Sequence, residues 1–385
     1  MNSKPGFLLP RLSVLDWVAL LLFCILFACG AYYIGSADRE FLVKPGLFGL
    51  ADWVLLILFS FAGLPLLTFG LVAVLALIGA QFRWPRFQFW KFIPSVFALM
   101  AMGCWATFRP FLFSDQFVIA DRPEQNASSH GDKSDRSVRV RILHANIYRF
   151  NVAPANLQRI ADLAVSESVD ILILHELREE QQSFLDMQLT ESYPYRLSST
   201  EHPYFGFGIY SNRPFFVRNL MAGRIEALAS IRVQASPGCD DLFDLLAVHP
   251  VAPFNPRILG VHRRTIGSLA EEITARKSAI PVVVTGDFNS VEWSPDRRNL
   301  LQKSGLRQAV SSDGWEQVFR GTYDARWWET FRLPIDAVLV SGDIRVLELR
   351  RVAIPGSDHL GLLAEVQIPD SANCASLRNF HRLSP

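Results

Sequence analysis

Three long apolar runs near the amino terminus constrain this chain more than any other feature. Residues 14–34 carry a single charge, at Asp16, and residues 53–80 and 92–108 carry none. At about 1.5 Å per helical residue, each run can cross or nearly cross a hydrocarbon layer of roughly 30 Å. We therefore expect a membrane region over residues 1–113, with three transmembrane helices at about 14–34, 53–80 and 92–112.

Two of these runs leave alternatives open. Pro65 lies inside the second run, where a membrane helix can hold a proline kink if neighbouring groups satisfy the freed carbonyl. A re-entrant pair of shorter segments is the alternative there. The first run could instead be a cleaved signal peptide, but it continues past Cys29 and two more runs follow. We favour three retained spans.

Basic residues beside the runs predict the orientation. Lys4 and Arg11 precede the first run, and Arg83, Arg86 and Lys91 separate the second from the third. Lys and Arg concentrate on the cytoplasmic side of a membrane, so an odd number of spans places everything after residue 113 outside the cytoplasm. For a bacterial cell, this predicts a multi-pass inner-membrane protein with an extracytoplasmic outer domain. The lipid bilayer is the partner implied, and the sequence implies no stable protein partner.

Behind the membrane region, the sequence predicts a linker, one globular domain and a tail. A flexible linker is expected over residues 114–137, of which 120–137 are polar and without periodicity, and residues 369–385 form the tail. Between them, short β-type runs alternate with helical spacing. Strands are expected near 138–147, 170–175, 208–211, 228–234, 242–248, 281–286, 335–341 and 361–368, and helices near 155–168 and 257–277. Many strands with fewer helices predict an α+β fold, a two-sheet β-sandwich flanked by helices. Cys239 and Cys374 fall in this outer part, and the sequence leaves open whether they pair.

Polar residues lie at the ends of several of these predicted strands. The apolar run 280–285 is followed directly by Gly-Asp-Phe-Asn, so Asp287 and Asn289 should emerge at its carboxyl end. Alone, such residues more often cap a turn or helix. Other strand ends, however, carry Asn146, Glu176, His249, Asp336, Asp358 and His359. Carboxylates, an amide and imidazoles together suit a metal-assisted phosphoester site.

The order and local contexts of these residues resemble the endonuclease/exonuclease/phosphatase superfamily. That group includes pancreatic-type deoxyribonuclease, abasic-site endonucleases, sphingomyelinases and inositol polyphosphate phosphatases. The resemblance spans about residues 138–368 and rests on the strings HANI, LILHE, GFGIYSNRP, LLAVHP, VVVTGDFNSVEWSP, PIDAVLVS and GSDHLGL, in the family's order. It implies a four-layer DNase I-like sandwich and a phosphoester hydrolase.

The resemblance also implies a metal site. Glu176 would be the chief ligand of Mg²⁺ or Mn²⁺, assisted by Asn146 and Asp358. Carboxylate and amide oxygens suit such hard ions, which keep water and phosphate in the remaining positions.

Catalytic roles follow from the same resemblance. His359 would contact the scissile phosphate or handle a proton, with Asp336 fixing its tautomer. Asp287 would orient or deprotonate the attacking water, and Asn289 would bind a phosphate oxygen. His249 would stabilise charge or protonate the leaving oxygen.

Three positions depart from the family's usual pattern. His175 precedes the metal glutamate where Gln is common, and Ala337 replaces the aromatic residue or His that often follows the family's Asp. Thr322 and Tyr323 stand where Thr and Trp are frequent. None of them removes a predicted catalytic group, but together they weaken any transfer of substrate preference.

The charge balance bears on the substrate. Residues 138–385 contain 27 Lys and Arg against 28 Asp and Glu, a formal charge of −1. Tight binding of long nucleic acid needs several phosphates neutralised, and no bulk basic excess is present. A local basic patch could still form; its candidates are Arg257, Arg263, Arg264, Arg297 and Arg298. The solvated faces of two helices are the alternative that we favour for them.

Together these features predict a membrane-anchored, metal-dependent phosphoesterase that hydrolyses phosphodiester or phosphomonoester bonds by in-line water attack. A nuclease and a lipid phosphodiesterase both fit. The alternative is a catalytically silent binding or scaffold domain of the same fold at the cell envelope. A transport role is disfavoured because the apolar runs hold no buried charge.

Overall fold

The computed structural model of the protein describes only part of the chain. The described residues are 116–121, 137–202, 204–222, 226–235, 241–276, 280–311, 321–324 and 332–369. The three expected spans lie outside these residues, as do Cys239 and Cys374. Across the described ranges, no helix combines the length and apolar character that crossing a membrane requires.

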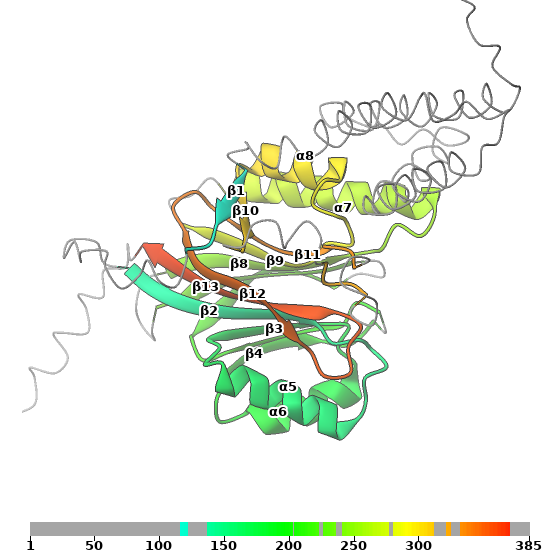
Figure 1. The fold of residues 1–385 in the computed structure, drawn as a ribbon, viewed down its shortest axis with the longest axis vertical. Coiled ribbons are helices and arrows are strands. Elements are labelled where there is room, and N and C mark those ends of the chain that lie inside the picture. Colours follow the sequence, from blue (N-terminus) through cyan, green and yellow to red (C-terminus); the bar gives the residue numbers. More distant parts are fainter. Residues whose placement is uncertain are drawn as a thin grey trace, which may run out of the picture. The chain divides into compact units, whose positions relative to one another are not determined.

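Two mixed β-sheets form the centre of the described part (Figure 1). In the first sheet the strand order is β1-β10-β11-β9-β8-β7-β6. Its strands are β1 (Phe117–Ile119), β6 (Phe215–Ala222), β7 (Glu226–Gln234), β8 (Asp241–Pro250), β9 (Val282–Asp287), β10 (Arg307–Val310) and β11 (Asp336–Val340). In the second sheet the order is β12-β13-β2-β3-β5-β4. Its strands are β2 (Ser137–Asn146), β3 (Ile171–His175), β4 (Tyr195–Ser199), β5 (Phe207–Ser211), β12 (Arg345–Ala353) and β13 (Leu360–Pro369).

Helices cover the outer faces of both sheets. In Figure 1, α7 (Pro256–Ala275) and α8 (Pro295–Ser304) lie over the first sheet, and α5 (Pro154–Ser166) and α6 (Glu179–Leu189) lie against the second. One apolar cluster fills the space between the sheets, and two more lie under the two helix layers. This arrangement confirms the predicted two-sheet α+β sandwich with helices outside.

Local sequence explains why the helices begin and face as they do. In α5, the buried residues Leu157, Ile160, Ala161 and Ala164 repeat at helical spacing, so one stripe faces the second sheet. Helix α7 begins after Asn255, whose side chain accepts a hydrogen bond from the Ile258 amide at 3.0 Å. The helices expected near 155–168 and 257–277 are therefore confirmed.

The central strands are buried on both faces. Every residue of β3 and of β9 is buried, because each strand has the opposite sheet on one side and helices on the other. Continuous apolar runs are the expected sequence signature of such strands, which is why both could be predicted.

The start of the predicted linker needs correction. Within residues 114–137, Phe117–Ile119 form β1, which pairs in parallel with β10 at the edge of the first sheet. Ala120 directly after it is 4% exposed and belongs to the core between the sheets. Three consecutive residues with aromatic or β-branched side chains favour a strand over a solvated linker.

Close packing of β8 and β9 explains the glycine of the Gly-Asp-Phe-Asn motif. A Cβ atom at Gly286 would stand 1.8 Å from the Val248 carbonyl oxygen of the parallel neighbour β8. Only glycine fits there, and Asp287 follows as the last residue of β9. The close approach therefore fixes where the Asp287 side chain enters the site.

Candidate active site

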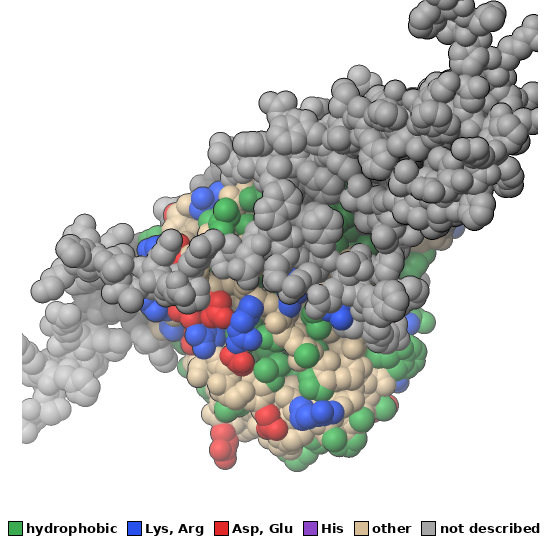
Figure 2. All heavy atoms as spheres, in the orientation of Figure 1, with side chains coloured by type: hydrophobic (Ala, Val, Ile, Leu, Met, Phe, Trp, Pro, Cys, Tyr) green, Lys and Arg blue, Asp and Glu red, His purple; other side chains and the backbone are tan. Residues whose placement is uncertain are grey.

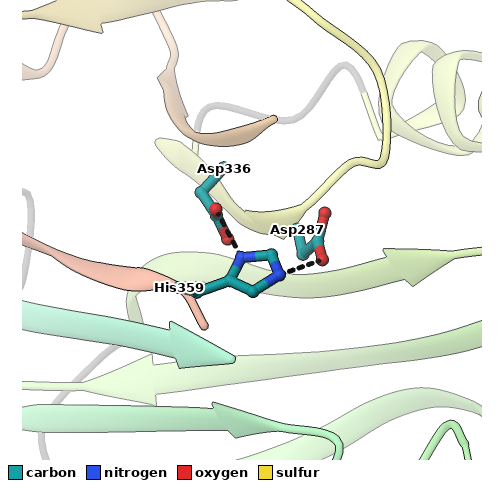
Figure 3. Close-up of side chains that lie close together, drawn as sticks. All are labelled: Asp287, Asp336 and His359. Atoms are coloured by element: carbon teal, nitrogen blue, oxygen red, sulfur yellow. Dashed lines mark hydrogen bonds and ion pairs between the residues drawn. The ribbon is translucent and has the colours of Figure 1, made fainter. Parts of the chain in front are cut away.

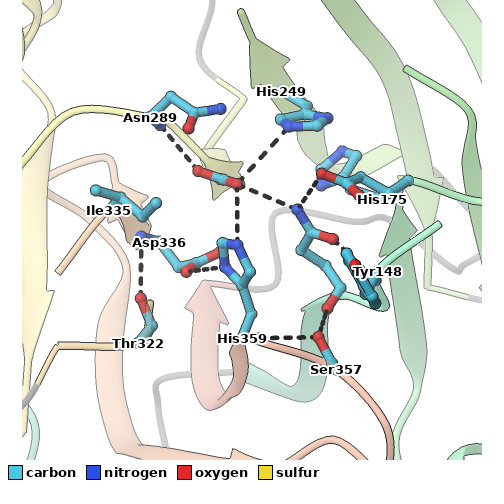
Figure 4. A network of polar contacts seen from close by, with 12 residues as sticks. Tyr148, His175, His249, Asn289, Thr322, Ile335, Asp336, Ser357 and His359 are labelled. Atoms are coloured by element: carbon cyan, nitrogen blue, oxygen red, sulfur yellow. Dashed lines mark hydrogen bonds and ion pairs between the residues drawn. The ribbon is translucent and has the colours of Figure 1, made fainter. Parts of the chain in front are cut away.

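The predicted site residues gather at one end of the sandwich, where strands of both sheets finish or begin. Asn146 ends β2 opposite His175, the last residue of β3, and Glu176 follows β3 directly. In the first sheet, Asp287 ends β9 directly opposite Asp336, the first residue of β11. Figure 4 shows the resulting network of polar contacts.

Asp336 and His359 form the closest pair of oppositely charged side chains in this network. The Nδ1 atom of His359 lies 2.9 Å from the Oδ2 atom of Asp336, and both residues are buried (Figure 3). Burial alone would lower the pKa of His359, but the charges of Asp336 and Asp287 outweigh it and raise this pKa to about 10. Burial likewise disfavours ionised Asp336, yet the His359 charge and hydrogen bond hold its pKa below the usual value. The pair is therefore an ion pair at neutral pH.

Asp287 is the hub of the network. Its Oδ2 atom lies 3.7 Å from Nε2 of His359 and 3.7 Å from Nε2 of His249. The same oxygen accepts a hydrogen bond from the Asn146 amide at 3.2 Å. Burial, and then the charge of Asp336, raises the pKa of Asp287. A carboxylate with a raised pKa at the meeting point of two imidazoles is suited to accept a proton.

Asn289 has a strained backbone at the edge of the network. Its φ is 49°, in the left-handed region, and its backbone N–H donates to Oδ1 of Asp287 at 2.9 Å. Its side-chain amide donates to the Pro250 carbonyl at 3.0 Å, directly after His249. The turn therefore holds Asn289 beside both Asp287 and the end of β8.

Glu176 and Asn146 form the more open side of the site. Glu176 also has a left-handed backbone, with φ 59°, and its side chain is 17% exposed. Its Oε1 atom accepts a hydrogen bond from the Asn146 amide at 3.2 Å, and its Oε2 atom accepts one from the Arg149 backbone N–H at 3.2 Å. The Arg149 guanidinium is 3.8 Å from that same oxygen. These contacts are longer, and therefore weaker, than the 2.9 Å contact between Asp336 and His359.

Two groups of side chains differ in how well their atoms suit a hard cation such as Mg²⁺. Within the described residues, Asp287, Asp336 and His359 place ligand atoms within 4.8 Å of one another. A protonated imidazole, however, has no lone pair to offer, so His359 does not fit as a ligand. Glu176 offers carboxylate oxygens, which Mg²⁺ and Mn²⁺ prefer, while the Asn146 amide presents its nitrogen to Glu176 at 3.2 Å and its oxygen to the Tyr148 backbone N–H at 3.1 Å.

Asp358, the third predicted ligand, is 8% exposed and precedes His359 in the connection to β13. The structure therefore brings Asn146 and Glu176 into direct contact, while the place of Asp358 in the metal set stays a prediction.

A pair of buried histidines lies behind these residues. Nε2 of His144 and Nδ1 of His175 are 2.9 Å apart, and neither side chain is exposed. Burial lowers the pKa of His144 to about 4 and the pKa of His175 well below its usual value, so both are neutral. The His175 ring is 5.3 Å from that of His249, and Nδ1 of His144 is 3.7 Å from Asp336. His144 was not among the predicted site residues, although period-2 alternation along β2 places it on the face of Asn146.

Serine and threonine hydroxyls connect these elements. Ser357 donates to the Asn146 carbonyl at 2.7 Å and accepts the His359 backbone N–H at 2.9 Å. The Asp336 backbone N–H donates to the Thr322 hydroxyl at 3.4 Å. Tyr323 stands where the family frequently has Trp, and its ring centroid is 4.7 Å from that of His359. The sequence departure at Tyr323 thus borders His359 directly.

Arg297 does not belong to a surface patch. It is fully buried, stacks 3.8 Å from the Phe288 ring centroid, and donates to the carbonyls of Ser290 and Ile335 at 3.0 and 3.3 Å. Burial lowers its pKa to about 10. Arg263 forms an ion pair with Asp296 at 3.2 Å. The candidate basic patch therefore loses Arg297, which instead ties the turn after Asp287 to the residue before Asp336.

A match to a protein family gives the class of protein to which this sandwich and polar site belong. Residues 143–359, more than half of the chain, match the endonuclease/exonuclease/phosphatase family. The chain belongs to that family, and it is a hydrolase acting on phosphoester bonds. The family is typically dependent on divalent metal ions. A search of curated protein sequences finds no match.

Solved structures of similar fold include members from bacteria and human. A family protein from Bacteroides thetaiotaomicron is 14% identical, with 61% of this chain and 96% of that chain covered, at a TM-score of 0.46. One from Bacteroides vulgatus is 16% identical, covering 60% and 99%, at 0.47. The human nocturnin catalytic domain with a bound sulfate anion is 17% identical, covering 61% and 97%, at 0.47.

Proposed function

We propose that this protein is a phosphodiesterase, dependent on Mg²⁺ or Mn²⁺ and anchored in the inner membrane by the three amino-terminal spans. The hydrogen-bonded Asp336 and His359 pair beside Asp287 is the observation that carries the proposal. It supplies a buried cation and a carboxylate with a raised pKa 3.7 Å apart, which an in-line displacement at phosphorus can use.

Each proposed role follows from a contact. His359 would donate Nε2–H to a phosphoryl oxygen, because Asp336 holds its other nitrogen at 2.9 Å. Asp287 would accept the proton of the attacking water. His249, 3.7 Å from Asp287, would stabilise charge or protonate the leaving oxygen, and Asn289 would bind a phosphate oxygen.

The metal would complete the open side. Glu176 and Asn146 would hold the ion, with Asp358 as the third ligand predicted for it. When bound, a divalent ion supplies Lewis-acid stabilisation of the charge that develops on phosphorus-bound oxygens. Glu176 is suited to this because its present partners are neutral amides at 3.2 Å and a guanidinium at 3.8 Å, all of which a cation can replace.

Substrate hydrolysis by the full-length chain tests the proposal. Purified protein is incubated with single- and double-stranded DNA, RNA, sphingomyelin and phosphoinositides, in the presence of Mg²⁺, Mn²⁺ or a chelator. We expect turnover with metal and none with chelator. Glu176→Ala and His359→Ala should each abolish it. Glu180→Ala, at a side chain of α6 that is 68% exposed, is the matched control and should retain it. Activity that survives both site substitutions would refute the assignment.

Membrane placement needs a separate measurement. The domain boundaries proposed are a membrane region over residues 1–113, a linker that ends before β2, a catalytic domain to about residue 368 and a tail over 369–385. A reporter enzyme that works only outside the cytoplasm should be active when it is fused after residue 113. Activity in the cytoplasm instead would reverse the proposed topology.

A further inference from the structure

Two exposed aromatic rings and one arginine lie beside the open side of the site. The Arg149 guanidinium carbon is 4.3 Å from the ring centroid of Tyr204 and 4.8 Å from that of Phe150. Phe150 is 57% exposed and Tyr204 is 49% exposed. We call Arg149, Phe150 and Tyr204 the aromatic rim. Its members come from two connections, one after β2 and one between β4 and β5.

Two routes of contact join the aromatic rim to the site. Arg149 donates its backbone N–H to Glu176 and brings its guanidinium within 3.8 Å of the same oxygen. From Tyr204, ring contacts continue through His202 at 5.9 Å, from there to Phe205 at 5.1 Å, and on to His249 at 5.5 Å. A substrate whose phosphate lies between Glu176 and His249 would therefore place its neighbouring group on the aromatic rim.

The part of the aromatic rim that carries Arg149 and Phe150 is held in place before any substrate arrives. Tyr148 has a left-handed φ of 63°, a strained conformation for a tyrosine that surrounding contacts must maintain. The fully buried Gln181 of α6 donates its side-chain amide to the carbonyls of Tyr148 and Asn151, each at 3.1 Å. Because the backbone on both sides of Arg149 and Phe150 is fixed, binding there costs little ordering entropy.

We propose that the aromatic rim binds a nucleobase, and that the substrate is a short nucleotide with a base next to the scissile phosphodiester. Rings and a guanidinium plane stack favourably on a heteroaromatic base, whose polar edges stay in water. An acyl chain would cover the Arg149 charge without compensating it. This inference rests on the proposed phosphodiesterase activity and names its substrate class.

Charge argues for a short substrate over a long nucleic acid. Residues 138–385 carry a formal charge of −1, with 27 Lys and Arg against 28 Asp and Glu. On the face visible in Figure 2, acidic and basic side chains are interspersed over the described residues and form no single basic track. Long strands are bound mainly through several phosphate contacts, whereas a short nucleotide depends on one phosphate and its base.

Dinucleotides with and without bases provide the test. Full-length protein is assayed with a dithymidine phosphodiester and with analogues that lack one base or the other. Long single-stranded DNA and sphingomyelin vesicles are run beside them. We expect one abasic analogue to show a KM about tenfold higher at similar kcat, since base stacking on an aromatic side chain contributes about that much or more.

Substitutions separate the aromatic rim from the catalytic residues. Tyr204→Leu and Phe150→Leu should raise the KM of the dinucleotide without changing that of the sensitive abasic analogue, and Tyr204→Phe should retain the wild-type KM. Phe216→Leu, at a 40% exposed ring on β6, is the control and should have no effect. Equal KM values for all dinucleotides, or preferential cleavage of vesicles or long DNA, would overturn the inference. Absence of turnover on every phosphodiester would instead refute the proposed function.

Discussion

The two sides of the active site differ in how far their charges are already satisfied. On the buried side, Asp336 and His359 are 0% and 5% exposed as side chains and hydrogen bonded to each other at 2.9 Å. On the open side, Glu176 and Arg149 are 17% and 28% exposed and 3.8 Å apart. The buried side is therefore part of the structural core as well as of the site, whereas the open side is available to ligands.

Removal of the buried imidazole should have the largest effect. His359→Ala should lower kcat by about 10²–10⁴-fold, the range for losing a positioned proton donor. It should also lower the free energy of unfolding by about 3–5 kcal/mol, because Asp336 would be left charged and buried without its partner. Paired kinetics and urea unfolding measure both. An inactive variant with unchanged stability would contradict the ion pair.

Substitution of Glu176, on the open side, should lower activity with little effect on stability. Glu176→Gln should lower kcat/KM at least about a hundredfold, since metal stabilisation of the transition state contributes several kcal/mol. Its unfolding free energy should fall by no more than about 1 kcal/mol, since Gln keeps an oxygen that can accept a hydrogen bond of Glu176 and removes a charge that has no partner closer than 3.2 Å. Calorimetric titration with Mn²⁺ should show weaker binding than in the Glu180→Gln control. A large loss of stability would remove the distinction between the two sides.

Alkaline pH should weaken the buried side selectively. The pKa of His359 is about 10 in the folded protein, against an ordinary value of 6.5. The stabilisation that its proton provides is therefore complete below pH 6.5 and is lost as pH rises toward 10. Between these values the folded state binds the extra proton, and stability falls as pH rises toward 10, by up to about 1.4 kcal/mol per pH unit. Unfolding of wild type and His359→Gln from pH 6 to 10 should show a steeper slope for wild type. Parallel slopes would contradict the raised pKa.

The smallest effect is expected where Ser357 connects the two sides. Ser357→Ala removes bonds to the Asn146 carbonyl and the His359 amide, so stability should fall by about 1 kcal/mol and kcat by less than about tenfold. Ser357→Thr, which keeps the hydroxyl, should restore both. If neither variant differs from wild type in thermal unfolding or kinetics, Ser357 does not couple the two sides.

Strong local patterns made much of the fold predictable. Strands β3 and β9 are continuous apolar runs that end in polar residues, and both are fully buried, as expected. Edge elements were missed for a physical reason. Strand β12 mixes Glu348, Arg350 and Arg351 with apolar residues because it borders the sheet, and its charges hide the alternation.

The site was predictable one strand end at a time, but its long-range contacts were not. Sequence order identified Asp287, Asp336 and His359, whereas the pairing of His144 with His175 depends on β2 and β3 being neighbours. Arg297 was assigned to the surface by its charge alone. It precedes the buried Leu300 and Leu301 by three and four residues, so the helical period of α8 places it on the inner face.

The neutral pair of His144 and His175 also affects the balance of charge in the site. Because His144 and His175 stay uncharged, they add no positive charge to that of His359, which faces the two carboxylates Asp287 and Asp336. Glu176 adds another negative charge at the opening. When all three acids are ionised, they outnumber the charges of His359 and of Arg149, which lies 3.8 Å from Glu176, by one, and this excess favours a cation over a phosphate anion. The uncharged imidazoles at positions 144 and 175 therefore leave an excess of negative charge, which the metal ion proposed above would neutralise.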